Sequence, residues 1–217
     1  MSIASTDEMR IADSVKVDDA IKGVKEYAER YWRTLKIFDG LGGDGYDDPE
    51  PDLITLADVA RLVVINGQPT AQDVGSLLDA DASALADLDE GATLESCEVG
   101  DLTWTIASQL YEAFRIDGIG PAKRSKLLHA KRPGLFFIND SRTGVSYQAV
   151  AAAHADPGGP AGQGFWAAAR EDILQDEFVD LMDRLKTCVV DTDGGPMNVG
   201  DLSRVRVLDI VCWSAST

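Results

Sequence analysis

The chain has 217 residues, is 45% hydrophobic and carries a formal net charge of -17. This length and composition fit one domain with a packed core and exclude a globally disordered chain. The sequence has no run of about 18 apolar residues and no signal-peptide pattern at its start, so we expect no membrane partner. Three widely spaced cysteines, Cys97, Cys188 and Cys212, argue against a disulfide scaffold or a zinc site and indicate a reducing, cytoplasmic setting.

Helical patterns follow one another along the chain. Apolar residues spaced i, i+3, i+4 predict a helix over 17–35, and the glycine- and acid-rich residues 39–52 predict an exposed loop. Thr55 and Thr70 each begin a Ser/Thr-x-x-acid signature, which predicts a helix start. Further helices are predicted over 82–88, 102–114, 141–153, 165–185 and 199–213, and one begins at Pro121.

No strand-like alternation and no internal repeat stand out from these helices. We therefore predict an all-α fold, with one helical domain over 16–217 and loosely held residues 1–15. The loop at 39–52 lacks the ordered acidic spacing of a calcium site, and we expect no metal or other cofactor. The two histidines, His129 and His154, have no spaced partner, so neither is a strong functional candidate.

A basic segment interrupts this acidic chain. Residues 115–142 carry seven arginines and lysines against two aspartates. Gly118-Ile119-Gly120 would form a tight turn with outward N–H groups, and Pro121 suits the first position of the next helix. Such a helix start favours phosphate, and lysines and arginines follow within a turn. The residues expected to bind phosphate or nucleic acid are Gly118, Ile119, Gly120, Lys123, Arg124 and Lys126.

The same segment resembles the helix-hairpin-helix motif of base-excision DNA glycosylases. The similarity rests on Ile116, the Gly-Ile-Gly turn, Pro133-Gly134 and Asp140, which lies 20 residues after Gly120. The resemblance implies a glycosylase-like helical domain with the motif at about 103–131 and a catalytic Asp140. The chain also resembles an uncharacterised bacterial family of similar length, through its acidic early loop and the segment "GIG…SKLL…KRP…D". That second resemblance implies no activity.

Two departures from the glycosylase pattern refine what the resemblance implies. Ala122 stands where bifunctional members carry the lysine that forms a Schiff base, which disfavours a lyase. Arg124 stands where a small alanine is usual between the two helices. The resemblance thus implies a monofunctional N-glycoside hydrolase in which the Asp140 carboxylate stabilises an oxocarbenium-like transition state. Tyr111, Tyr147 or Trp166 would supply an aromatic wall for the base.

The residues themselves leave several readings open. Asp140 is equally well placed to cap the helix that follows it, because aspartate is a common N-cap. The substrate is either DNA, with a flipped nucleotide, or a free nucleoside or nucleotide. The strongly acidic chain favours the small substrate, because duplex DNA requires many cationic contacts. A hypothesis from a different functional class is that the protein is a non-catalytic interaction module that retains the hairpin as a scaffold. The sequence indicates no oligomeric state.

Overall fold

The computed structural model describes residues 8–9, 15–41, 48–144, 146–147 and 163–215, and these are mostly helical. The predicted tail at 1–15, most of the predicted helix at 141–153 and His154 lie largely or wholly outside them. The main helices are α1 (Val17–Ile37), α2 (Leu56–Val64), α3 (Ala71–Leu78), α4 (Leu102–Ala113), α5 (Pro121–Lys131), α7 (Gln163–Ile173), α8 (Asp176–Leu185) and α9 (Arg204–Ala215). The short 3₁₀ helices are η1 (Ser83–Asp87) and η2 (Val199–Asp201).

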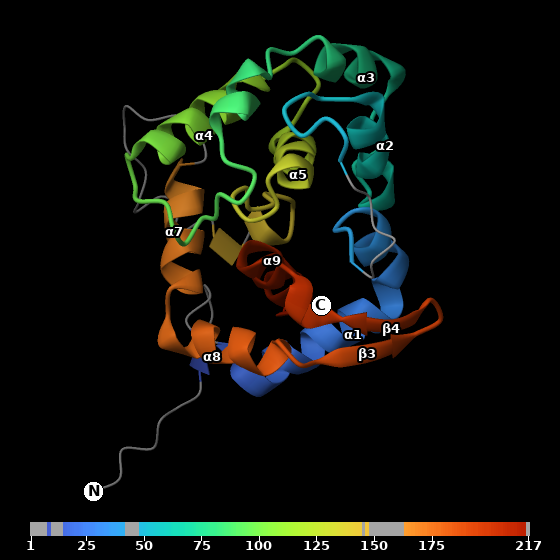
Figure 1. The fold of residues 1–217 in the computed structure, drawn as a ribbon, viewed down its shortest axis with the longest axis vertical. Coiled ribbons are helices and arrows are strands. Elements are labelled where there is room, and N and C mark those ends of the chain that lie inside the picture. Colours follow the sequence, from blue (N-terminus) through green and yellow to red (C-terminus); the bar gives the residue numbers. More distant parts are fainter. Residues whose placement is uncertain (1–7, 10–14, 42–47, 145, 148–162, 216–217) are drawn as a thin grey trace, which may run out of the picture.

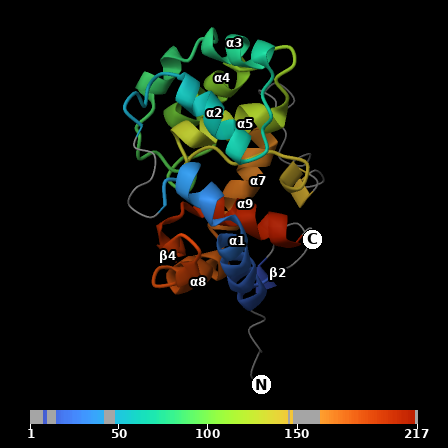
Figure 2. The same cartoon turned by 90° about the vertical axis from the view of Figure 1, so that its right-hand side faces the viewer.

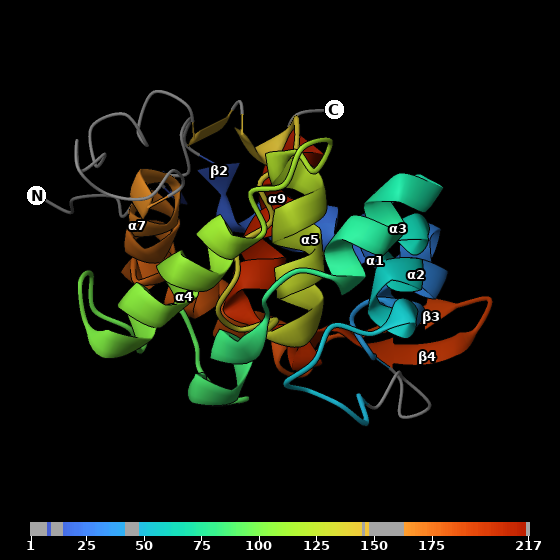
Figure 3. The same ribbon diagram turned by 90° about the horizontal axis from the view of Figure 1, so that it is seen from above.

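The helices form two groups that meet across the middle of the molecule. In Figure 1, α2, α3, α4 and α5 make up the upper group, and α1, α8 and α9 lie in the lower part. Within these groups α1 packs on α9 and α2 packs on α5, while α7 contacts both α8 and α9. The side view in Figure 2 shows the same division, and in the view from above in Figure 3 α5 lies in front of α9.

Local capping fixes where several helices begin. Thr55 caps α2 and Thr70 caps α3, each in a reciprocal box with the aspartate three residues on, as their sequence signatures predict. Asp101 caps α4 through a 2.7 Å hydrogen bond from the backbone N–H of Trp104. These bonds satisfy helix-end N–H groups that would otherwise have no partner.

The structure corrects the expected helix at 165–185, which is two helices. Leu174 and Gln175 separate α7 from α8, and Gln175 has an extended backbone as the N-cap of α8. Asp176 and Glu177 then fall in the first turn of α8, where the helix dipole favours negative charge. The apolar pattern continues through the break, so periodicity alone did not reveal it.

The expectation of a chain without strands is also wrong in detail. Strands β3 (Val189–Thr192) and β4 (Gly195–Asn198) pair antiparallel, and a second pair joins β1 (Glu8–Met9) to β2 (Val15–Lys16). Asp193-Gly194 links β3 to β4, and Asp-Gly is a strong signal for a two-residue hairpin. A Cβ on Gly194 would overlap the Trp32 ring, so this glycine lets the hairpin pack on α1.

One large hydrophobic core runs through both groups of helices and includes Leu62, Phe136, Phe178 and Ile210. The predicted short helix at 82–88 is η1, whose Leu85 is buried in that core. Cys97 and Cys212 are buried and Cys188 is partly buried, and all three are free thiols. Among the described residues, no helix combines the length and apolar character that crossing a bilayer requires.

Candidate functional site

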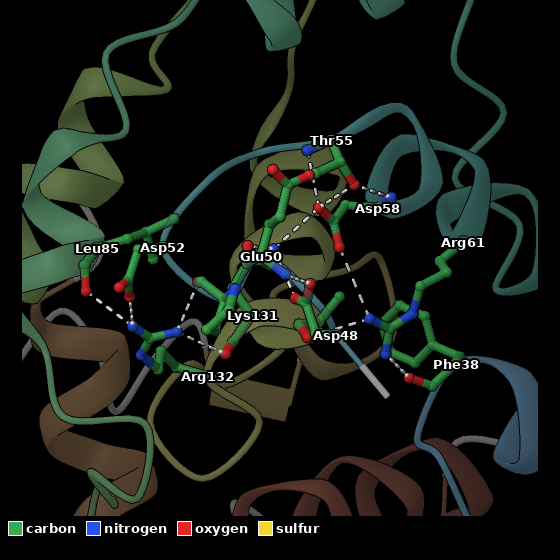
Figure 4. A network of polar contacts seen from close by, with 12 residues as sticks. Phe38, Asp48, Glu50, Asp52, Thr55, Asp58, Arg61, Leu85, Lys131 and Arg132 are labelled. Atoms are coloured by element: carbon green, nitrogen blue, oxygen red, sulfur yellow. Dashed lines mark hydrogen bonds and ion pairs between the residues drawn. The ribbon is translucent and has the colours of Figure 1, made fainter. Parts of the chain in front are cut away.

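Much of the basic segment serves the interior of the protein. Figure 4 shows Lys131 and Arg132, at the end of α5, among acceptors from the residues 48–58. The Lys131 ammonium donates to Asp48 at 2.5 Å and to Asp58 at 3.0 Å, and its side chain is fully buried. Arg132 pairs with Asp52 at 2.8 Å and also donates to main-chain carbonyl groups of η1 and of residue 51. These cations therefore anchor the acidic loop to α5.

The three cations expected to bind phosphate point in different directions. Lys123 donates to Asp73 of the neighbouring helix α3 at 2.5 Å. Arg124 is buried, with its guanidinium 3.9 Å from the centre of the Tyr111 ring on α4. Lys126 is also buried and donates to the main-chain carbonyl of Ile65 at 3.0 Å. These three side chains therefore lie on different sides of α5, because successive residues of a helix turn by about 100°.

The Gly-Ile-Gly turn between α4 and α5 forms much as the sequence predicts. Gly118 has a positive φ of 86°, a conformation that favours glycine, and Gly120 is the N-cap of α5 with Pro121 in its first turn. Ile119 is buried between two exposed glycines, and its N–H donates to the main chain of Ile116. A Cβ on Gly118 would stand 3.4 Å from the Asp73 carboxylate, so an acidic group lies beside this turn.

A pocket of about 480 Å³ lies where the two helix groups meet. This volume falls in the range of small-molecule sites. Its walls come from α1, the end of α2, α5, the segment after α5, and α9. The charged side chains among its lining residues are Lys126, Asp140, Arg142, Arg206 and Asp209. The structure thus brings Lys126 and Asp140 together in a pocket and leaves Gly118, Ile119, Gly120, Lys123 and Arg124 outside its lining.

The two oxygens of Asp140 have different partners. Oδ1 accepts the backbone N–H groups of Arg142 at 2.9 Å and Thr143 at 3.2 Å, just before helical residues begin at Thr143. Oδ2 lies 3.7 Å from the Lys126 ammonium, and both of these residues line the pocket. Asp140 is therefore a cap as well as a pocket residue, so capping and a chemical role are compatible.

A buried polar network contributes Arg206, Asp209 and Tyr27 to the pocket lining. Arg206 on α9 donates through Nε to Asp39 at 2.8 Å, through Nη1 to Asp209, and through Nη2 to the Tyr27 hydroxyl at 3.1 Å. The Asp39 and Asp209 side chains are almost fully buried. Burial raises the pKa of Asp209 to about 6, with Arg206 opposing this shift and Asp140 adding to it.

The aromatic wall of the pocket consists of residues other than those expected. Tyr111, Tyr147 and Trp166 are packed in the core and do not line the pocket. The aromatic residues that do line it are Tyr27, Tyr31 and Trp213. Their rings lie 4.9 to 5.5 Å apart, and the Arg142 guanidinium stacks 4.1 Å from the Trp213 ring.

Sequence reasoning missed most of this pocket, although weak signals for it exist. Tyr27 and Tyr31 are four residues apart and share a face of α1, where they counted only as part of the apolar stripe. Arg206 and Asp209 are three residues apart within the mostly apolar helix α9. Burying a charged side chain is costly unless it has a partner of opposite charge. Two opposite charges three residues apart in a mostly apolar helix therefore indicate a buried ionic site. No group of metal-ligating side chains occurs among the described residues.

Comparison with known proteins gives a family but no activity. The chain matches, over residues 20–216, the model of a family of unknown function, DUF6308. The chain belongs to this family. No curated protein and no solved structure matches it.

Proposed function

We propose that this DUF6308 protein hydrolyses the N-glycosidic bond of a nucleoside or nucleotide, with the Asp140 carboxylate stabilising an oxocarbenium-like sugar. The observation that carries this proposal is the position of Asp140, beside Lys126 in a pocket of about 480 Å³. Cleavage of this bond builds positive charge at the anomeric carbon, which a fixed carboxylate offsets. The two hydrogen bonds that Oδ1 accepts from the backbone hold the carboxylate in place.

The pocket also offers surfaces for the base and for an anionic group. The rings of Tyr27, Tyr31 and Trp213 suit the face of a heterocyclic base, because base–aromatic stacking contributes about 1–3 kcal/mol per base. Arg142, held on the Trp213 ring, and Lys126 supply positive charge for a phosphate. Both features are expected of a site for a nucleoside or a nucleoside monophosphate.

Charge distribution favours a small substrate over duplex DNA. A protein that grips duplex DNA uses many lysines and arginines against phosphates. Here Arg124, Lys131 and Arg132 are buried, Lys123 pairs with Asp73, and the whole chain carries a net charge of -17. We also propose that the α4–α5 turn is a glycosylase-like hairpin. In this protein it serves as a scaffold, and its cations make internal contacts.

A non-catalytic interaction module is the second candidate function. It is favoured by the capping role of Asp140, because a cap explains the residue type without any chemistry. The two candidates differ in one outcome, since only the enzyme releases a base.

The decisive experiment measures release of free base by chromatography. Purified protein is incubated with a panel of nucleosides, nucleoside monophosphates and damaged-base oligonucleotides, each at low and high salt. We expect base release from one of the small substrates. Asp140→Asn should lower this rate about a hundredfold, because a missing electrostatic contact of this type costs on the order of 3 kcal/mol in the barrier.

Asp101→Asn is the matched control for this substitution. Asp101 caps α4 in the same way as Asp140 caps its own helical segment, but it does not line the pocket. Asp101→Asn should therefore keep the wild-type rate. Equal rates in wild type and Asp140→Asn would remove Asp140 from the mechanism. A wild-type protein that releases no base from any substrate would support the interaction module, and salt-sensitive activity on oligonucleotides alone would identify a DNA substrate.

A further inference from the structure

A chain of buried polar groups leads from Asp209 on α9 through Arg206 and Asp39 to His129 on α5. The His129 ring donates through Nδ1 to the Phe136 carbonyl at 2.7 Å, and its Nε2 lies 3.7 Å from Asp39 Oδ1. Asp39 accepts from Arg206, and Arg206 in turn donates to Asp209. Of this chain, Arg206 and Asp209 reach the pocket. The pocket is therefore connected to groups that can hold a proton away from bulk water.

The charge of this network favours one retained proton. Two buried carboxylates, Asp39 and Asp209, share the Arg206 guanidinium, and a buried carboxylate without a full counter-charge is costly. Burial alone would raise the pKa of Asp39, but Arg206 and then His129 together hold it below its usual range. The pKa of Asp209 instead rises to about 6, mainly through burial. Asp209 is thus the carboxyl group of the pair that keeps its proton to higher pH.

Asp209 is surrounded by charged and titratable groups from several elements. Its own helix provides Arg206, α1 provides Tyr27, and the segment after α5 provides Asp140, whose negative charge also favours a protonated Asp209. Asp39, His129 and the buried thiol of Cys212 also lie near this network, and Lys126 on α5 pairs with Asp140. Because Arg206 already donates to Oδ2, Oδ1 is the oxygen of Asp209 that would carry the proton.

We propose that Asp209 is a second catalytic residue of the pocket, a general acid that protonates the departing base while Asp140 stabilises the sugar. This inference rests on the proposed function and specifies its substrate class. The substrate is an N-glycoside of a heterocycle that leaves as a neutral base after gaining a proton on a ring nitrogen, as purines do. Two carboxyl groups in one pocket commonly divide the work in this way, one as an acid and the other as a stabiliser of positive charge.

The step balances in atoms and charge. The bond between the anomeric carbon and the base nitrogen breaks, its electron pair goes to the base, and the Asp209 proton is transferred to a ring nitrogen. A water oxygen then bonds to the anomeric carbon, and a proton of that water passes to Asp140. Exchange through water in the pocket returns this proton to Asp209, so the net reaction consumes one water and yields a free base and a free sugar.

Two leaving groups separate the roles of the two aspartates. Wild type, Asp140→Asn, Asp209→Asn and the control Asp172→Asn, a buried carboxylate that does not line the pocket, are assayed on the purine nucleoside and on the 4-nitrophenyl glycoside of the same sugar. Nitrophenolate leaves without a proton. We expect Asp209→Asn to lose about a hundredfold in kcat on the nucleoside and little on the nitrophenyl glycoside. Asp140→Asn should lose activity on both substrates.

The pH dependence gives a measurement that needs no substitution. In wild type, kcat on the nucleoside should fall as pH rises above about 6, because the acid form of Asp209 is then depleted. This limb should be absent with the nitrophenyl glycoside. An Asp209→Asn variant that loses both activities equally, or neither, would overturn the role of Asp209 while Asp140 stands. A wild type inactive on both substrates would overturn the function itself, and this inference with it.

Discussion

Lys131 Nζ lies 3.0 Å from Asp58 Oδ2, and neither side chain is accessible to solvent. The same aspartate closes the capping box of α2 through the Thr55 N–H, so one carboxylate joins the end of α5 to the start of α2. This link explains why an acidic protein concentrates lysines and arginines in one segment. Several of them are internal counter-charges for the acidic residues 48–58 and for the helix that follows.

Lys131→Met should destabilise the protein strongly. It would leave the buried Asp58 and the partly buried Asp48 without their ammonium, and breaking a buried pair typically costs about 3–5 kcal/mol. Chemical denaturation would measure this loss. Lys22→Met, which breaks an exposed pair with Glu26, should change the free energy of unfolding by less than about 1 kcal/mol. Similar effects of the two substitutions would contradict a structural role for Lys131.

Substitutions of Asp140 should separate its capping from its charge. Asp140→Ala removes the acceptor for two backbone N–H groups and should cost about 1 kcal/mol of stability. Asp140→Asn keeps an oxygen for the cap and should cost much less, since asparagine caps about as well as aspartate. Thermal and chemical unfolding of both variants would test this order. A larger loss for asparagine than for alanine would argue against the cap.

The two glycines of the α4–α5 turn should respond differently to alanine. Gly118 has a φ of 86°, so Gly118→Ala places a side chain in the left-handed region at a cost of about 1–2 kcal/mol. Gly120 has a φ of -72° and open space around its Cβ direction, so Gly120→Ala should cost less and only through the weaker N-cap preference of alanine. Unfolding free energies of the pair would reveal the difference. Equal costs would mean that the turn has another conformation.

Asp209 should make stability fall between about pH 4 and pH 6. Its pKa is about 6 in the folded protein and near its ordinary value of 3.8 in the unfolded chain, so in this window the folded state holds more protons. Stability that is present below the window is lost as the pH rises through it, by up to about 3 kcal/mol. Asp209→Asn should lack this loss, and its denaturation curves at pH 4, 5, 6 and 7 would show a smaller change than wild type. A parallel pH dependence in the two proteins would contradict the raised pKa.

The sequence by itself determined the features that depend on local hydrogen bonds and periodicity. Thr55 and Thr70 begin helices because a capping box forms between residues three apart. The helix predicted over 17–35 exists as α1 because its apolar stripe repeats at helical spacing. The Gly-Ile-Gly turn and Pro121 likewise specify the start of α5 without help from distant residues. The hairpin of β3 and β4 also has such a local signal, Asp193-Gly194.

Only the tertiary structure decided which charges meet. Lys123, Lys126 and Lys131 look alike in the sequence, yet they bind Asp73, face Asp140 and neutralise Asp58 respectively. Their partners lie between 14 and 73 residues away, and the direction of each side chain depends on how α5 packs between α2 and the rest of the core. The pocket depends on the same packing. Tyr27 on α1 and Asp209 on α9 become neighbours of Asp140 only when the two helix groups close around their shared hydrophobic core.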